Sequence, residues 1–191
     1  MKVNVIDDSY IVPALLGIGL SYGITSEETK TSILANKELL EKCKNIVDKL
    51  ALVGNGENKF LRQCPISLDI TAPMYWWKEF DTYKIGTTAQ SESTMHTLLK
   101  KPITQDMFES PIPDEMLKIL ESLRTEKRFR ELINMLPMGW LQRRIVTANY
   151  AVLQNIYNQR KNHKLIEWHT FIDAVLKGAS HPNFICKKED K

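Results

Sequence analysis

The stretch that decides the fold is Ala72–Gly86, "APMYWWKEFDTYKIG", which places aromatic side chains among charged ones. At about 100° per residue, Trp76, Phe80 and Tyr83 line one side of a helix, with Trp77 beside them. Charged and polar residues point the other way. The pattern therefore predicts a helix whose aromatic face packs into a core or lines a pocket for a flat ligand.

The residues before this helix predict strands. "CPISLDI", Cys64–Ile70, alternates apolar and polar residues, as a half-buried strand does. Pro73 suits the first turn of the helix that follows. The chain opens with "MKVNVI", Met1–Ile6, which also alternates and is rich in strand-forming residues. Strands mixed with helices predict an α/β (α+β) fold with a central sheet.

The rest of the chain predicts mainly helices. Ser26 can cap a helix that runs to Gly54, with Glu27 and Glu28 in its first turn. Three further helices are expected: one over residues 111–136, a long one from about Met138 to Arg160, and a last one over Lys164–Gly178. Residues 84–98, "KIGTTAQSESTMHTL", show neither helical nor strand-like hydrophobic periodicity and predict a loop. Loops often carry binding or catalytic residues.

Composition indicates an ordinary globular protein. With 191 residues and 22.1 kDa, the chain suits a single domain over residues 1–191. Apolar residues make up 43% and charged residues 26%, which excludes a wholly disordered or fibrous chain. The formal net charge is only +3 and the basic residues are dispersed, so nucleic-acid binding is not expected.

Cysteine usage and hydropathy indicate a cytoplasmic protein. The three cysteines lie far apart and form no C-x-x-C motif, which fits a reducing compartment. The most apolar run, residues 10–20, is broken by Pro13 and two glycines, whereas a membrane span needs about 20 apolar residues. No secretory signal is recognised. We expect neither a leader nor a membrane span.

Common catalytic and metal motifs are missing. "GNGENK", residues 54–59, lacks the glycine spacing that holds phosphate, and a simple turn is expected there. The histidines and cysteines have no zinc-ligand spacing, and no G-x-S-x-G motif is present, so we expect no metal and no hydrolase triad. His163 and Glu167 are four residues apart and are expected to form an exposed pair.

Two polar residues share one face of the long predicted helix. Asn149 and Arg160 are eleven residues apart, which at about 100° per residue returns almost to the same direction. Leu153 and Ile156 lie between them on that face. Burying an unpaired polar group costs about 1–3 kcal/mol, and more for a charge, so both side chains need a partner. That partner is either another part of the protein or a ligand with carbonyl and phosphate oxygens.

Two long stretches, Gly56–His96 and Leu136–His169, resemble the flavin-dependent thymidylate synthases. That family's pattern has a glycine turn, Phe-Glu-His, a strand, Ala-Pro, an aromatic helix and Arg-Gln-x-x-Arg-His-Arg-x7-Ser. It continues with Leu-Pro, an Asn, an Arg eleven residues on, and a His-Ala-Gln-x-Glu element. The matching residues here are Ala72–Pro73, Leu136–Pro137, Asn149, Arg160, His163 and Glu167. The resemblance covers most of residues 54–178 and rests on spacing more than identity.

Several of the family's motif residues are replaced. The family's Arg-His-Arg falls on Thr82, Tyr83 and Lys84, and the Arg and Gln before it fall on Lys78 and Glu79. The family's Glu-His falls on Arg62 and Gln63. Its serine falls on Glu92, between Ser91 and Ser93, and a later arginine falls on Thr94. In the family these side chains hold FAD and the phosphate of deoxyuridine monophosphate (dUMP). Charge-assisted hydrogen bonds contribute about 1.5–3 kcal/mol each, so losing several weakens a cofactor by powers of ten.

The resemblance therefore implies FAD but puts its binding in doubt. The residues left at flavin-contacting positions are Arg62, Gln63, Lys78, Tyr83 and His163. The nucleotide side is less altered, and the resemblance implies a dUMP-like ligand held by Lys84, Ser91, Ser93, Asn149 and Arg160. It also implies a homotetramer whose pockets are completed by neighbouring chains. The aromatic helix is then mostly core, and the segment after it, Lys84–His96, brings polar groups to the pocket.

Three functions follow from these observations. The first is a nucleotide-binding protein built like a flavin-dependent thymidylate synthase, with the flavin motif largely replaced. The second is an active enzyme that methylates dUMP to dTMP with FAD, a reduced nicotinamide and methylenetetrahydrofolate. The third is a non-catalytic structural protein in which Asn149 and Arg160 are satisfied internally. No catalytic residue is assigned. Because relatives occur in viruses of bacteria, a virus-encoded protein acting in the host cytoplasm is expected.

Overall fold

The computed structural model describes residues 1–24 and 36–187. Its strands are β1 (Lys2–Asp7), β2 (Pro65–Pro73), β3 (Thr88–Ser91) and β4 (Leu141–Asn149). Its α-helices are α1 (Val12–Ser21), α2 (Lys37–Leu50), α3 (Met74–Phe80), α4 (Thr94–Thr97), α5 (Asp114–Thr125), α6 (Phe129–Met135), α7 (Tyr150–Arg160) and α8 (Ile166–Gly178). Short 3₁₀ helices are η2 (Glu57–Gln63), η3 (Gln105–Met107) and η4 (Pro182–Phe184).

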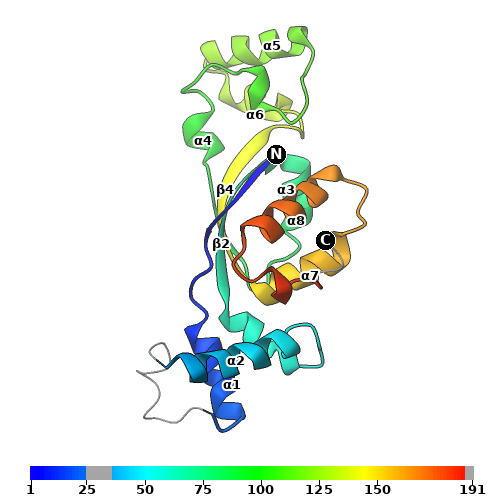
Figure 1. Cartoon of the computed structure of the whole chain (residues 1–191). Coiled ribbons are helices and arrows are strands. Elements are labelled where there is room, and N and C mark those ends of the chain that lie inside the picture. The colour runs from blue at the N-terminus through cyan, green and yellow to red at the C-terminus, as the bar shows by residue number, and fades with distance from the viewer. Residues whose placement is uncertain (25–35, 188–191) are drawn as a thin grey trace.

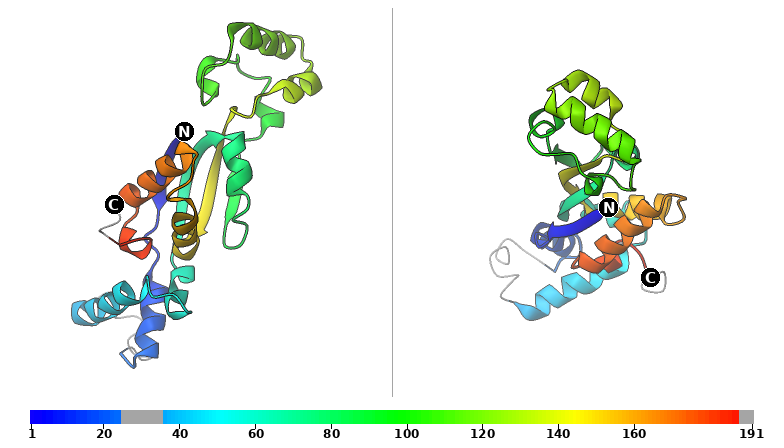
Figure 2. Two further views of the ribbon diagram at one scale, coloured as in Figure 1. Left: turned by 90° about the vertical axis from the view of Figure 1, so that its right-hand side faces the viewer. Right: turned by 90° about the horizontal axis from the view of Figure 1, so that it is seen from above.

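The molecule is elongated around a four-stranded antiparallel sheet of order β1-β2-β4-β3 (Figure 1). Helices α1 and α2 lie at one end of the sheet, and α4, α5 and α6 form a lobe at the other end. Helices α3, α7 and α8 cover one face of the sheet (Figure 2). The mixed α/β architecture and the strands expected near residues 1–6 and 64–70 are confirmed.

The long pairing of β2 with β4 forms the backbone of the fold. The register runs without interruption from Pro65 opposite Asn149 to Pro73 opposite Leu141. Alternate residues of β2 are fully buried against the helices: Ile66, Leu68, Ile70 and Ala72. The alternation seen in the sequence thus fixes which face of the strand enters the core.

The aromatic face of α3 is core, as expected. Trp76 and Trp77 are both 0% exposed. The Trp76 ring lies 4.8 Å from Trp168, 5.1 Å from Phe80 and 5.5 Å from Phe171, measured between ring centroids. Aromatic pairs at such distances add to the burial energy of each ring. Helix α3 is therefore anchored to α8 as well as to the sheet.

The long helix expected from about Met138 to Arg160 is wrong in its first half. Residues Leu141–Asn149 form β4, and the helix begins only at Tyr150. Strand β4 hydrogen-bonds to β2 on one side and to β3 on the other. Its β-branched run Ile145–Thr147 favours a strand, and pairing on both edges overrides the helical spacing of the neighbouring residues.

Two other segments differ from expectation. The loop expected over residues 84–98 contains β3 and α4. The helix expected over 111–136 is two helices, because the backbone turns at Lys127, which has a φ of 58°. The helix expected from Ser26 to Gly54 is present in its described part as α2, over Lys37–Leu50, where the Asn36 side chain accepts a hydrogen bond from the Leu39 amide. Ser26, Glu27 and Glu28 lie outside the described residues.

The lobe at the end of the sheet has a hydrophobic cluster of its own. Its buried members are Leu98, Ile103, Phe108, Leu120, Leu123 and Leu132. A larger cluster joins the sheet to α1, α2, α3, α7 and α8. A single domain over residues 1–191 stays a prediction.

A buried carboxylate ties three distant segments together. Asp8, which is 7% exposed, accepts hydrogen bonds from the Tyr150 hydroxyl at 2.6 Å and from the Ser180 amide at 2.6 Å. The Ser180 hydroxyl also donates to it at 2.7 Å. Burial alone would raise the pKa of the Asp8 carboxyl, but these hydrogen bonds outweigh burial and lower the pKa from its ordinary 3.8.

Because the folded pKa is the lower one, ionised Asp8 stabilises the fold above about pH 4, and this stability is lost as the pH falls through the folded value. We predict that Asp8→Asn lowers the free energy of unfolding by about 1.5 kcal/mol near neutral pH. The difference from the wild type should shrink in acid. Urea unfolding at a series of pH values measures it, with Asp173→Asn, at an exposed residue of α8, as control. A pH-independent difference would contradict the role given to the charge.

Candidate functional site

The guanidinium of Arg160, at the end of α7, is held by side chains of the same chain. Its Nη1 lies 3.1 Å from Oε2 of Glu79, and its Nε donates to the Tyr83 hydroxyl at 2.8 Å. The guanidinium also lies over the Trp168 ring, 4.9 Å from its centroid. The Arg160 side chain is 18% exposed. The sequence left open whether Arg160 is paired by the protein or by a ligand. Within one chain, the protein itself supplies partners for Arg160.

Glu79 is the centre of this cluster. Its Oε2 also accepts a hydrogen bond from Nε1 of Trp168 at 2.8 Å and lies 3.6 Å from Nε2 of His163. Nδ1 of His163 accepts a hydrogen bond from the Leu165 amide at 3.2 Å. The carboxylate therefore competes with any anionic ligand for Arg160.

Asn149 caps α7 and does not lie within a longer helix. Its Oδ1 accepts a hydrogen bond from the Val152 amide at 3.1 Å. Its Nδ2 faces Gly86, where an added Cβ would come within 3.0 Å of that nitrogen. Gly86 has a φ of +81°, so both its conformation and its close approach require glycine. The side-chain nitrogen Nδ2 of Asn149 donates no hydrogen bond in the described parts of the chain.

Asn149 and Arg160 thus occupy the two ends of α7. Eleven residues of helix separate them by about 16 Å along the axis. Leu153 and Ile156 between them are buried, as expected, at 3% and 1% exposure. The segment that links α3 to β3 runs along this helix, since Tyr83 contacts Arg160 and Gly86 contacts Asn149.

The other predicted nucleotide residues fall into two places. Lys84 is exposed and lines a hollow of about 260 Å³ with Phe80, Asp81, Thr87 and Ala89. Ser91 ends β3 opposite Arg144, and Ser93 caps α4, where its hydroxyl accepts a hydrogen bond from the His96 amide at 3.3 Å. From Arg144 to Asn149, β4 extends about 17 Å. Lys84 thus belongs to the segment between α3 and β3 that contacts Arg160 at one end of α7 and Asn149 at the other, while Ser91 and Ser93 lie at the far end of β3.

A hollow of about 210 Å³ lies beside Ser93, where the sheet meets the helical lobe. Its polar lining includes Thr94, Thr97 and Lys101, together with the carboxylates of Glu92 and Asp106. Leu98, Met107, Trp140 and Leu141 supply an apolar wall. No motif in the sequence singles out Lys101 or Trp140, so neither residue was predicted.

The predicted flavin-contacting residues do not come together in one chain. Arg62 and Gln63 lie in η2 before β2, whereas Lys78 lies in α3 after it. Strand β2 alone separates them by about 26 Å. The Tyr83 hydroxyl donates to Gln159 at 2.9 Å, and His163 lies in the Glu79 cluster. With carboxylates at Glu79 and Glu92, the side chains present do not fit the phosphates of FAD within one chain.

The pair expected between His163 and Glu167 is wrong. Glu167 is only 6% exposed and accepts a hydrogen bond from the Tyr75 hydroxyl. Burial and this carboxylate together raise the pKa of Tyr75. His163 precedes α8 and turns toward Glu79 instead. Packing of α3 against α8 supplies Glu167 with a partner that the sequence could not show.

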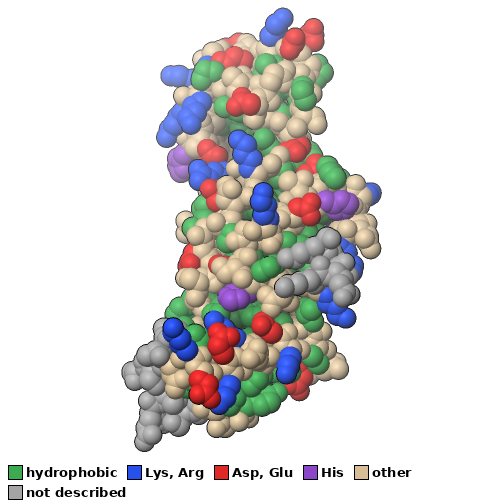
Figure 3. Space-filling view, viewed as in Figure 1, with side chains coloured by type: hydrophobic (Ala, Val, Ile, Leu, Met, Phe, Trp, Pro, Cys, Tyr) green, Lys and Arg blue, Asp and Glu red, His purple; other side chains and the backbone are tan. Residues whose placement is uncertain are grey.

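Other chemical groups are unremarkable in this structure. Burial raises the pKa of the Cys64 thiol to about 12, so it is no thiolate nucleophile at neutral pH. Within residues 1–24 and 36–187, no group of three or more His, Cys, Asp or Glu side chains could hold a metal ion. None of the described helices is long and apolar enough to cross a membrane. Basic and acidic side chains are interspersed over the face shown in Figure 3.

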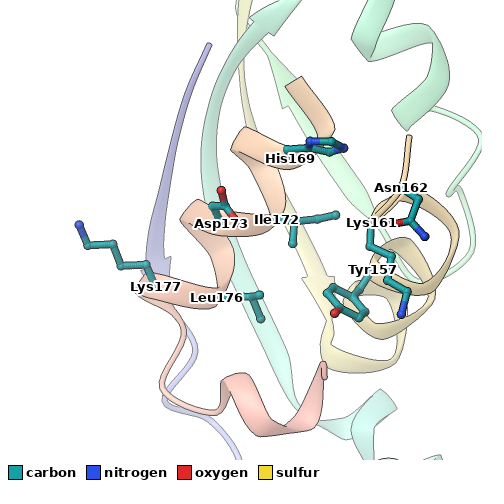
Figure 4. A pocket seen from close by; sticks show the side chains of 8 residues that line it. All are labelled: Tyr157, Lys161, Asn162, His169, Ile172, Asp173, Leu176 and Lys177. Carbon is teal, nitrogen blue, oxygen red and sulfur yellow. The ribbon is translucent and has the colours of Figure 1, made fainter. Parts of the chain in front are cut away.

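A further hollow lies elsewhere, between α7 and α8 (Figure 4). Its volume is about 680 Å³. None of the residues predicted to bind nucleotide or flavin lines it.

Solved structures share this fold. A flavin-dependent thymidylate synthase ThyX from Helicobacter pylori, complexed with FAD and dUMP, aligns with a TM-score of 0.72 at 15% identity over 97% of this chain and 98% of that one. A second ThyX structure from that organism, also with FAD and dUMP, gives 0.75 at 14% identity over 100% and 99%. The UMP/dUMP methylase PolB from Streptomyces cacaoi, bound with 5-Br dUMP, gives 0.59 at 10% identity over 95% and 92%.

Sequence comparison gives no such match. No family model matches the chain, and no curated protein matches it significantly. The chain nevertheless has the fold of the flavin-dependent thymidylate synthases across its full length, as the resemblance implied.

Proposed function

We propose that this chain binds a pyrimidine nucleoside monophosphate such as dUMP. The observation that carries the proposal is the set of donors around the turn after α3: the Lys84 ammonium, the Nδ2 amide of Asn149 and the Arg160 guanidinium. Such donors match the carbonyl and phosphate oxygens of a nucleotide. The proposal is also supported by the dUMP and 5-Br dUMP named in the structures that share the fold.

The site is proposed to form between copies of the chain in a homotetramer. Ser91 and Ser93 lie about 17 Å along the sheet from the end that carries Asn149. The short serine side chains cannot reach a nucleoside monophosphate held at Asn149 in the same chain, whereas the long side chain of Arg160 leans back along α7 toward Asn149 and shortens the distance of about 16 Å between their backbones. A neighbouring copy that supplies its own Ser91 and Ser93 would complete the pocket.

Thermal unfolding in the presence of nucleotides tests this function. A ligand at 100 times its Kd raises the free energy of unfolding by about 2.7 kcal/mol. We expect dUMP to raise the Tm, and deoxyuridine, which lacks the phosphate, to raise it less. If no pyrimidine nucleotide changes the Tm, the purely structural role becomes the better account.

We predict that the purified protein is colourless and takes up no added FAD. The reason is that the guanidinium forks expected to hold flavin phosphates are replaced by Thr82 and Lys84, and Glu79 adds a carboxylate nearby. The absorbance spectrum after purification and after incubation with FAD measures this. A retained flavin band would contradict the prediction and favour the second candidate, FAD-dependent methylation of dUMP. That candidate draws its support from the FAD named in the two Helicobacter pylori structures.

Glu79→Gln is predicted to raise the affinity for dUMP by about tenfold, equivalent to about 1.4 kcal/mol. The amide can still accept the hydrogen bond from Trp168, but it no longer neutralises Arg160 or repels an anion. Calorimetric titration measures the change. Glu131→Gln, which removes an exposed carboxylate paired with Arg128 in the helical lobe, serves as control and should have no effect. An unchanged or weaker affinity in Glu79→Gln would show that the carboxylate does not restrain Arg160.

A cytoplasmic location and a viral genome as the source stay expectations from the sequence.

A further inference from the structure

The groove between α7 and α8 has the dimensions of a small-molecule site. Its volume of about 680 Å³ falls within the range of about 300–1,000 Å³ that is typical of ligand pockets. The two helices are joined by a short connection, residues 161–165, and both contribute to its walls (Figure 4). It is separate from the Arg160 cluster, because successive residues of a helix point about 100° apart and Lys161, not Arg160, lines the groove.

The groove combines an apolar floor with polar groups. Ile172 and Leu176 of α8 point toward Tyr157 of α7 and form the floor with it (Figure 4). Lys161 and Asn162 lie on the α7 side. His169 and Asp173 lie on the α8 side, with Lys177 at the far end, where it extends away from the others. A floor of this kind suits a flat or apolar body.

Lys161 is the cation best placed to meet a ligand. Its Nζ lies over the Tyr157 ring, 5.2 Å from the centroid. It forms no ion pair in the described parts of the chain. The same groove contains His169, whose buried Nε2 has no hydrogen-bond partner among the described residues. Buried polar atoms in native proteins are generally paired, so an orphaned one calls for a partner.

The charge on the α7 side of the groove favours an anion. The ammonium of Lys161 lies on that side, whereas the carboxylate of Asp173 belongs to α8 and Lys177 extends away. An anion on the α7 side would meet Lys161 at the edge of the apolar floor, and a cation there would be repelled by it.

We propose that this groove is a second binding site that takes a small organic anion with a flat or apolar body. The anionic group would lie at Lys161 and Asn162, and the body would lie against Tyr157, Ile172 and Leu176. The site is independent of the nucleotide site proposed above, and neither proposal requires the other.

The test uses the aromatic sulfonate 8-anilinonaphthalene-1-sulfonate as the probe, followed by its fluorescence on the folded full-length protein. We expect one saturable site per chain. Lys161→Gln should weaken binding about tenfold, because the charge is lost while a polar side chain only one atom shorter is kept. Lys164→Gln removes an exposed lysine of the same connection that does not line the groove, and it should leave the affinity unchanged.

A neutral probe with the same aromatic body, N-phenyl-1-naphthylamine, separates charge from hydrophobic contact. It should bind more weakly than the sulfonate and be insensitive to Lys161→Gln. Equal affinity of the sulfonate for the wild type and Lys161→Gln would overturn the proposal, as would non-saturable binding. Displacement of the sulfonate by dUMP would also overturn it, because the two sites would then be one. Failure of dUMP to bind at all would leave these outcomes unaffected.

Discussion

Arg160→Ala is expected to lower the affinity for dUMP by about 10- to 100-fold. The guanidinium is the donor proposed to meet the nucleotide, and a charge-assisted hydrogen bond contributes about 1.5–3 kcal/mol, where 1.4 kcal/mol is a factor of ten. Arg160→Lys should fall between the wild type and the alanine variant, because it keeps the charge but loses the planar fork. Calorimetric titration of the three proteins measures these differences.

The control for this prediction is Arg128→Ala. Arg128 forms ion pairs with Glu126 and Glu131 in the helical lobe, but it is 49% exposed and remote from the residues proposed to bind the nucleotide. Its removal should leave dUMP binding intact. Circular dichroism of each variant confirms folding, since Arg160→Ala also takes a partner from Glu79. If Arg160→Ala bound dUMP as well as the wild type does, the guanidinium would have a structural role only.

Trp76→Ala is expected to lower the free energy of unfolding by about 3–5 kcal/mol. The ring is fully buried and contacts Phe80, Trp168 and Phe171, so its loss leaves a cavity where α3, α8 and the sheet meet. Urea unfolding measures the loss. The typical stability of a domain is about 5–15 kcal/mol, so a loss of this size removes a large fraction of it.

Two substitutions serve as controls for the cavity. Trp76→Phe should cost clearly less than alanine, since Nε1 of Trp76 has no hydrogen-bond partner among the described residues and most of the ring volume is kept. Ile85→Ala should have almost no effect, because Ile85 is 94% exposed. A loss below about 1 kcal/mol for Trp76→Ala would contradict the role of α3 as the anchor of this core.

The sequence predicted the elements whose pattern is local. Strand β2 alternates, and one of its faces is buried residue by residue, so its pattern directly reflects its environment. The aromatic stripe of α3 was recognisable for the same reason. The helix that ends at Gly178 was also identified, with its final residue.

Strand β4 was missed because its environment is set by distant residues. Arg143 and Arg144 point to opposite faces, where they pair with Asp69 and Asp81. Neither aspartate is near in sequence, and two consecutive arginines do not show the alternation of apolar and polar residues that predicts a strand. The β-branched run Ile145–Thr147 was the available signal for a strand. The break at Lys127 likewise depends on packing within the helical lobe.

The role of the candidate site residues in binding stays a prediction, and their contacts could not be predicted from the sequence. Asn149 and Arg160 were identified by spacing, and both are partly buried at the ends of α7. That Glu79 pairs with Arg160 depends on how α3 packs beside α7 and α8, which no local pattern encodes. The hollows lined by Lys101 and by Lys161 carry no motif at all. Packing between elements, not residue type, creates them.

The measurement that tests the central claim most directly is a calorimetric titration of the wild-type protein with dUMP and, separately, with deoxyuridine. We predict saturable binding of dUMP and binding of deoxyuridine at least about tenfold weaker, because the nucleoside lacks the phosphate that the cationic groups of the site would hold. No detectable heat with dUMP at millimolar concentration, or equal affinity for the two ligands, would contradict the account.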